Sequence, residues 1–179
     1  MQKLYIANKI VNGTFGLAKH LYIVFDPDGN PSSGDELILR GGPENLSSPL
    51  GHLTLELGVG VSESLDGLAD PYYEGEGLPN ANDRNFTLLA EGTQAEVYWD
   101  LMISFAATLA SVAGADEGDT VVTPLDYDAA QANSNSTITS VMAAAGLDIY
   151  SNLPVIGGDL DGDGIKDGDT ATERVDQDE

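Results

Sequence analysis

The sequence predicts an α+β domain in which a small antiparallel sheet packs against two main helices. Its first half holds short apolar runs bounded by Gly, Pro, Asp and Ser, and its second half holds two longer stretches of helical periodicity. Strands that precede the helices, instead of alternating with them, are typical of α+β folds. With 179 residues, 41% of them hydrophobic, the chain is long enough for one sizeable core.

The first predicted strands form a β-hairpin. The apolar runs Leu21–Phe25 and Leu37–Leu39 flank a loop rich in Pro, Gly, Asp and Ser, which is a hairpin pattern with a long loop. The sequence RGGP at Arg40–Pro43 then predicts a sharp backbone turn.

Two further strands are expected before the helices. Residues 52–61, HLTLELGVGV, alternate between apolar and other side chains, and residues 86–90, FTLLA, are a short apolar run. Residues 62–85 between them are rich in Gly, Pro, Asp and Glu. We expect this segment to be a long surface loop.

The first helix is predicted to begin at Thr93–Glu96. The sequence TQAE is a capping box, in which the Thr hydroxyl meets the amide of Glu96 and the Glu side chain reaches back. Apolar residues spaced four apart then form one stripe. They are Val97, Leu101, Phe105 and Leu109, and the helix is expected to end near Gly114.

The second helix follows a segment that contains Pro124 and is interpreted as a linker. Its predicted buried face is apolar at helical spacing, and Gly146 is the predicted stop. The residues of that face are Ile138, Val141, Met142 and Ala145. We assign residues 1–156 to the globular domain and residues 157–179 to an acidic, Gly-rich tail that has too few apolar residues to pack.

Charge and composition exclude several functions. The formal net charge is -23, from 30 acidic and 7 basic residues, which is the opposite of the balance found in nucleic-acid-binding proteins. No apolar run approaches the roughly 20 residues that cross a bilayer, so no membrane span is expected. The absence of cysteine excludes disulfides and thiolate sites. Solubility, calcium binding and hydration in high salt all remain explanations of the acidity.

The polar run at the second helix start holds a candidate nucleophile, Ser134. A helix N-terminus presents unpaired amides and a positive dipole end, which stabilise an alkoxide or a tetrahedral oxyanion. Serine also needs a base, and the histidines of the chain are His20 and His52, each of which opens a predicted strand. The run fits equally well a set of competing helix caps, and His20 fits a half-buried residue at a strand end.

The residues that lead into this helix resemble those of the circularly permuted papain-like proteins, especially the PPPDE peptidase group. In that group Tyr-Asp and a short run lead to Asn-Cys-Asn at a helix start, and here YDAAQANSNS begins at Tyr127. The resemblance places Ser134 at the family's cysteine, and Asn133 and Asn135 at its flanking asparagines.

A second part of the resemblance concerns the histidine. The sequence HLYIVFDPDG, followed by RGGP, is similar to the family's histidine strand, hairpin and Gly-rich turn. It places the family's catalytic histidine on His20, extends over residues 19–147, and implies a papain-like fold. Serine in place of cysteine removes the thiolate that a Cys–His pair forms readily.

The tail carries a predicted calcium loop, DLDGDGIKDGD. Alternating side-chain oxygens and one backbone carbonyl wrap a hard cation, and Gly164 allows the tight turn. The predicted ligands are Asp159, Asp161, Asp163, Ile165 and Asp167. Thr170 stands where an EF-hand has its bidentate Glu, which argues against a paired EF-hand sensor.

A shorter acidic alternation occurs in the predicted hairpin loop. Asp26, Asp28 and Asn30 alternate, but Pro31 stands where a calcium loop has Gly. Asp-Pro-Asp-Gly is also a strong turn sequence, so we interpret this segment as a hairpin loop, with calcium binding as the alternative.

Two functions follow, and the sequence leaves both open. One is an acyl hydrolase acting on a peptide or ester, with Ser134 as nucleophile, His20 as base, His52 as the second choice of base, and Asn135 as an orienting group. The other is a catalytically inactive, calcium-dependent binding or structural module of a secreted bacterial protein. The acidic composition, the lack of cysteine and the calcium-type tail resemble bacterial RTX-type proteins, which implies an extracellular location.

Overall fold

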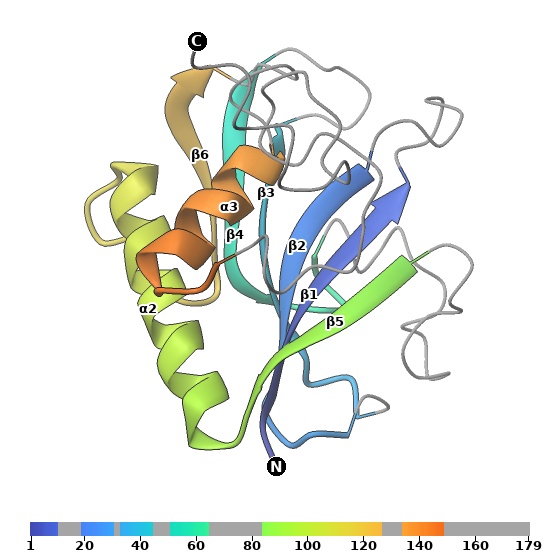
Figure 1. Ribbon diagram of the computed structural model, residues 1–179. Helices are drawn as coiled ribbons and strands as arrows, with labels where there is room; N and C mark the ends of the chain where they lie inside the picture. Colours follow the sequence, from blue (N-terminus) through green and yellow to red (C-terminus); the bar gives the residue numbers. More distant parts are fainter. Residues whose placement is uncertain (11–18, 31–32, 45–50, 65–83, 127–133, 149–179) are drawn as a thin grey trace, which may run out of the picture.

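The computed structural model of the chain describes residues 1–10, 19–30, 33–44, 51–64, 84–126 and 134–148 (Figure 1). The elements in chain order are β1 (Lys3–Ile10), β2 (Lys19–Asp26), β3 (Leu37–Pro43), β4 (His52–Gly60), β5 (Arg84–Glu91), α2 (Thr93–Ala110), β6 (Asp119–Asp126) and α3 (Ser134–Ala144).

The described strands form one antiparallel sheet in the order β5-β1-β2-β3-β4-β6. The predicted hairpin is confirmed: β2 and β3 pair Ile23 with Leu39 and Phe25 with Leu37. The strands predicted over residues 52–61 and 86–90 are also present, as β4 and β5.

Both described helices cover the same face of the sheet (Figure 1). Trp99 of α2 is buried and stacks on Phe25 of β2, with ring centroids 5.2 Å apart. Ile138 and Val141 of α3 are fully buried in the same core. The predicted fold class is therefore confirmed: an α+β arrangement in which an antiparallel sheet packs against two helices.

The opposite face of the sheet carries a second buried layer. Because side chains alternate along a strand, Tyr5, Tyr22 and Ile38 lie on this side and form a separate apolar cluster. The same face holds an ion pair between cross-strand neighbours, Arg40 Nη1 and Glu56 Oε1, 3.0 Å apart and almost fully buried. We call it the second face below.

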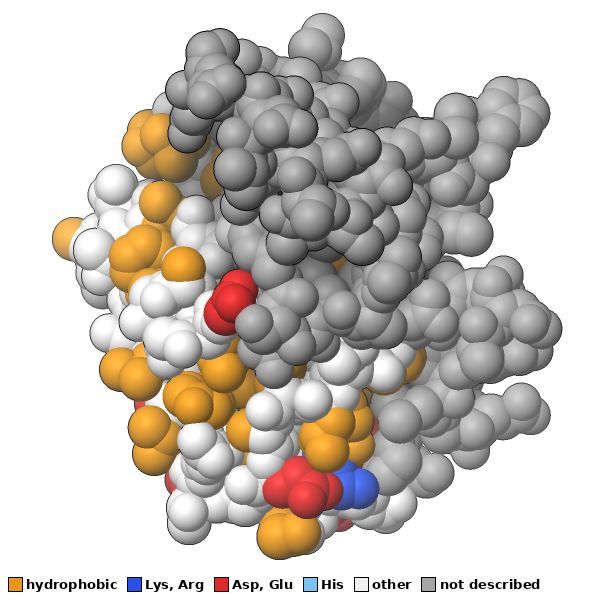
Figure 2. Space-filling view, viewed as in Figure 1, with side chains coloured by type: hydrophobic (Ala, Val, Ile, Leu, Met, Phe, Trp, Pro, Cys, Tyr) orange, Lys and Arg blue, Asp and Glu red, His pale blue; other side chains and the backbone are white. Residues whose placement is uncertain are grey.

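The apolar stripe predicted for α2 does not face the core. Val97 is 54% exposed, Leu101 is 47% exposed and Phe105 is 37% exposed, and hydrophobic side chains gather over α2 in the space-filling view (Figure 2). Rows spaced four apart drift by roughly 40° per step around a helix, so a second row competes for the core. That row contains the large Trp99 and several small residues, and the buried set is Ala95, Trp99, Met102, Ile103, Ala106 and Ala110.

The capping box predicted at the start of α2 is wrong. Thr93 is already helical, and the N-cap is Gly92, with φ 62°. Glycine has no side chain that could accept a hydrogen bond from a backbone amide of the first turn. Glu96 Oε2 instead accepts a hydrogen bond from Gln2 Nε2 at 3.2 Å. The helix ends at Ala110, earlier than predicted, because Ser111 adopts a left-handed conformation with φ 54°.

The turn predicted at RGGP is also wrong, because Arg40–Pro43 continues β3. The two glycines of this segment serve packing. A Cβ on Gly41 would lie 2.9 Å from Thr137 Oγ1 of α3, and a Cβ on Gly42 would lie 2.1 Å from Arg40 Nη2. Glycine therefore allows α3 to approach the sheet closely.

Two strands were not predicted. β1 is an interior strand between β5 and β2, and β6 occupies the segment interpreted as a linker. β6 contains Pro124, which edge strands tolerate because an edge leaves some backbone groups unpaired.

The interpretation of α3 is confirmed. Its predicted buried residues are buried, and Gly146 follows the helix with φ 79°. The amide of Leu147 donates to the carbonyl of Met142 at 2.9 Å, which closes the helix end.

Within the described residues, neither helix combines the length and the apolar character that crossing a membrane requires.

Candidate functional site

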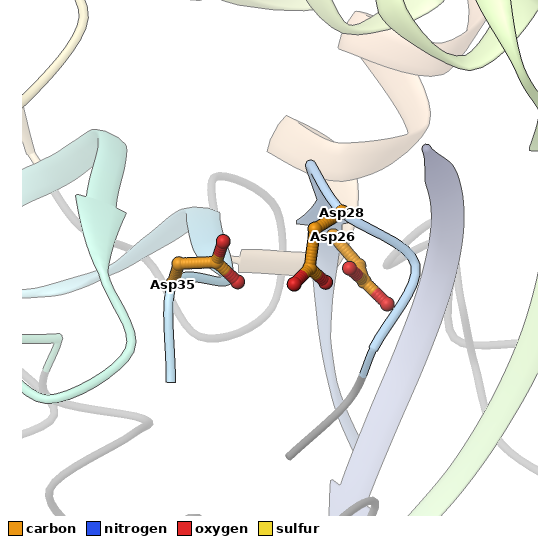
Figure 3. Close-up of side chains that lie close together, drawn as sticks. All are labelled: Asp26, Asp28 and Asp35. Atoms are coloured by element: carbon orange, nitrogen blue, oxygen red, sulfur yellow. The ribbon is translucent and has the colours of Figure 1, made fainter. Parts of the chain in front are cut away.

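The loop that joins β2 to β3 gathers three aspartates. One carboxylate oxygen from each of Asp26, Asp28 and Asp35 lies within 4.8 Å of the others. Asp35 approaches from the β3 side of the loop and points toward the other two carboxylates (Figure 3). This arrangement could hold a metal ion. We call these three residues the loop aspartates.

Local backbone bonding explains how the loop presents these side chains. Asp26 Oδ1 accepts the amide of Gly29 at 2.6 Å, and Asp28 Oδ1 accepts the amide of Asn30 at 2.6 Å. These are the Asx-turn contacts expected of an Asp-Pro-Asp-Gly sequence. Ser33 Oγ donates to Asp35 Oδ1 and contacts the Asn30 carbonyl at 2.8 Å, so both sides of the loop are held by short-range bonds.

Asp26 differs from the other two aspartates in its burial. It is 1% exposed, and its Oδ2 has no hydrogen-bond partner, whereas Asp28 and Asp35 are both exposed. Burial raises the pKa of the Asp26 carboxyl, and the nearby Asp28 and Asp35 charges raise it further. A buried carboxylate oxygen without a partner is costly, and an ion in the loop would satisfy it.

The chemistry of this donor set fits a hard cation. Carboxylate oxygens are the preferred ligands of calcium and magnesium, and the described ligands of the loop offer oxygen alone. Sequence reasoning identified Asp26 and Asp28 but missed Asp35. The signal that would have found Asp35 is the strand pairing. In the β2–β3 register, the residues just before β3, including Asp35, come back beside Asp26 at the end of β2.

The calcium loop predicted in the tail lies outside the described residues. Asp159, Asp161, Asp163, Ile165 and Asp167 all belong to the segment after residue 148. The boundary predicted at residue 156 lies there as well, and both remain predictions.

The start of α3 lies against β2, at Leu21, the residue that follows His20. Asn135, 7% exposed, accepts a hydrogen bond through Oδ1 from the amide of Leu21 at 2.9 Å. β3 pairs with β2 only from Ile23 onward, so this part of β2 is left open on the β3 side and the α3 side chain bonds to it. The predicted neighbours Asn135 and His20 therefore belong to segments in direct contact.

The side chain of His20 lies on the second face. It is 7% exposed, and its ring stacks on Tyr22 with centroids 6.1 Å apart. The backbone of Ser134 opens α3, but its side chain lies outside the described part, so the predicted pairing of nucleophile and base remains a prediction.

His52, the second choice of base, has a different setting. It opens β4, its side chain is 50% exposed, and its Nδ1 lies 3.6 Å from Asp126 Oδ1 of β6. An exposed contact of this kind contributes little to stability. The described contacts of His52 are those of an exposed residue at the start of a strand.

A separate hollow of about 340 Å³ lies beside α2. It is lined by Asp100, Ile103, Ser104, Ala107, Ala115, Asp116 and Glu117. None of the predicted site residues in the described ranges lines it. One of its walls is fixed by Trp99, whose Nε1 donates to Glu117 Oε1 at 2.7 Å.

Comparison of the chain with protein-family models, with curated proteins and with solved structures gave no match. The function is therefore argued from the geometry of the site.

Proposed function

We propose that this protein is a calcium-binding module in which one ion holds the β2–β3 loop through the loop aspartates. The observation that carries this proposal is the convergence of three carboxylates within 4.8 Å, one of them buried with an unpartnered oxygen. Calcium takes six to eight oxygen ligands in flexible geometry, which suits an irregular loop that also has backbone carbonyls and water to offer. The module serves as a binding or structural part of an exported protein.

The test is a calcium-dependent change in thermal stability. Calcium added to the chelator-treated full-length chain is expected to raise the Tm, because a ligand that binds only the native state stabilises it by about 2.7 kcal/mol at a hundred times its Kd. The loop variant Asp28→Asn/Asp35→Asn should lose this rise.

The tail provides the matched control. The variant Asp161→Asn/Asp163→Asn removes the same number of charges from the predicted tail loop. It should keep the rise in Tm, because we expect calcium to order the tail without building the core. A rise that persists in the loop variant and vanishes in the tail variant would assign the stabilising ion to the tail and refute the proposal.

The second candidate function is the acyl hydrolase with Ser134 as nucleophile and His20 as base. The bond between Leu21 and Asn135 supports it only in bringing the start of α3 to the strand that carries His20, because the His20 ring lies on the face of the sheet that the helices do not cover. Amides at the start of α3 would stabilise the oxyanion, and Asn135 would act as a positioning residue.

A fluorophosphonate probe tests this second candidate. Labelling is expected in the unmodified chain and should be lost in Ser134→Ala and in His20→Ala. His52→Ala is the matched histidine control and should retain labelling. If the unmodified chain stays unlabelled, the hydrolase candidate is refuted, and the calcium proposal is unaffected.

A further inference from the structure

A fourth carboxylate, Glu36, adjoins the loop aspartates and is buried without a described partner for its charge. It is 1% exposed, and neither of its side-chain oxygens has a hydrogen-bond partner. Its backbone is fixed, since its carbonyl accepts the amide of Val61 at 2.9 Å. Burying an unpaired carboxylate costs several kcal/mol, so the position favours either a protonated carboxyl group or a partner that carries positive charge.

The strand register places Glu36 opposite Asp26. β2 and β3 pair Val24 with Ile38 and Phe25 with Leu37, and one step further along the same register joins Asp26 to Glu36. Directly opposed residues of an antiparallel pair have Cβ atoms about 5 Å apart and share one face. Like charges in that position are destabilising, and here both carboxyl groups are buried.

The nearby basic residues do not neutralise this pair. Lys3 is the β1 partner of Asp26 in the sheet, yet no ion pair within 4.0 Å joins it to either carboxylate in the described part of the chain. Arg40 lies on the same face of β3 but is bonded to Glu56. The amino group of Met1 also lies at this loop, but it donates to the backbone carbonyl of Asp28 at 2.7 Å, so no described cation is paired with Asp26 or Glu36 within 4.0 Å.

We propose that Glu36 is a further ligand of the cation held by the loop aspartates, so that one ion joins the end of β2 to the beginning of β3. This inference rests on the proposed calcium site and deepens it. The oxygens of Glu36 are outside the group that lies within 4.8 Å. Its side-chain oxygens have no hydrogen-bond partner in the described part of the chain, and the proposal requires a change of rotamer that turns them toward the ion.

Four carboxylates also determine which ion the site prefers. Calcium accepts carboxylates that are mono- or bidentate at variable angles, whereas magnesium demands near-ideal octahedral geometry and usually keeps several waters. A site assembled from two strand ends and a loop meets the first requirement more easily. We therefore expect calcium to bind in preference to magnesium.

The experiment is a calorimetric titration of calcium into the ion-free, full-length chain. The calcium-binding event that is lost in Asp28→Asn is assigned to the loop. Glu36→Gln keeps the shape of the side chain and removes its charge, Glu36→Asp keeps the charge and shortens the reach, and Glu63→Gln is the matched control at an exposed position. Each variant is also melted without calcium.

The expected result is that Glu36→Gln weakens the loop event about tenfold or more. Glu36→Asp should weaken it too, and Glu63→Gln should leave it unchanged. Without calcium, Glu36→Gln should melt at a higher temperature than the unmodified chain, because one of two opposed buried charges is gone. Such opposite effects on binding and on ion-free stability distinguish a ligand from a residue needed for folding.

Two other results would be informative. If Asp28→Asn abolishes the loop event while Glu36→Gln binds calcium as the unmodified chain does, Glu36 is not a ligand and the inference fails, although the calcium site stands. If Asp28→Asn leaves every binding event unchanged, the loop holds no ion, and both the site and the inference fail.

Discussion

Leu21 and Asn135 are joined by a buried hydrogen bond of 2.9 Å across 114 residues of sequence. The backbone amide of β2 donates to the side chain at the start of α3, where β3 has not yet begun to pair with β2. This bond ties the second helix to the central part of the sheet.

Asn135→Leu should therefore destabilise the protein by about 1–3 kcal/mol, because the Leu21 amide would be left buried without an acceptor. Urea unfolding followed by the fluorescence of Trp99 measures this change, since Trp99 is the single tryptophan and is buried. Asn135→Asp, which keeps an acceptor oxygen, should lose less. Equal stability of Asn135→Leu and the unmodified chain would contradict the structural role of this bond.

Gly41 should tolerate no side chain, because a Cβ there would meet Thr137 Oγ1 at 2.9 Å. We expect Gly41→Ala to cost about 1–3 kcal/mol through overpacking between β3 and α3. Gly60→Ala is the matched control, since a Cβ on Gly60 would meet nothing within 4 Å. The comparison uses urea unfolding, and an equal loss in the two variants would count against close packing at Gly41.

The Arg40–Glu56 pair makes a prediction about buried charge. Arg40→Met alone should cost about 3–5 kcal/mol, because Glu56 would keep an uncompensated buried charge. The double variant Arg40→Met/Glu56→Leu should recover most of that loss. Chemical denaturation of the two variants side by side tests this, and a double variant no more stable than Arg40→Met would show that the charge is not the cause.

Stability without calcium should fall as the pH rises. Burial raises the pKa of both Asp26 and Glu36, and the neighbouring aspartate charges add to the effect. The native state thus binds more protons than the unfolded chain above the ordinary carboxyl pKa of about 4. The native state is therefore more stable at low pH, and this extra stability is lost as the pH rises through the raised pKa values of the two carboxyl groups.

The measurement is the free energy of unfolding in chelator from about pH 5 to about pH 8. Glu36→Gln should flatten the decline, and saturating calcium should reverse it, because ion binding favours the ionised carboxylates. A decline of the same slope in Glu36→Gln would locate its origin in the general acidity of the chain.

The parts of the fold that could be predicted were those in which pattern and turn chemistry agree. The run Leu21–Phe25, the return at Leu37 and the intervening Asp-Pro-Asp-Gly all indicate a hairpin, and the buried face of α3 follows from its spacing alone. α2 was harder, because its sequence holds two apolar rows. Packing around Trp99, which involves Phe25 far away in the sequence, decides which row is buried.

The site was predictable only in part. Asp26 and Asp28 form a local motif, but Asp35 and Glu36 join them through strand register, which no short window contains. Glu36 in particular precedes an apolar run and gives no sign of burial in the sequence. The approach of α3 to the strand that carries His20 was suggested by the resemblance to permuted papain-like proteins, whereas the hydrogen bond to the Leu21 amide emerges only from the assembled sheet.

The two outer strands of the sheet have a consequence for self-assembly. β6 carries Pro124 near the irregularity in its register with β4. The row of backbone groups that this edge presents to a neighbouring chain is therefore interrupted, because proline has no N–H to donate. β5 has no proline. Edge-to-edge pairing of two copies would thus run from β5 to β5 around a two-fold axis, which closes at two chains. Open-ended fibrils need two receptive edges on every copy, and the described part of this sheet has one.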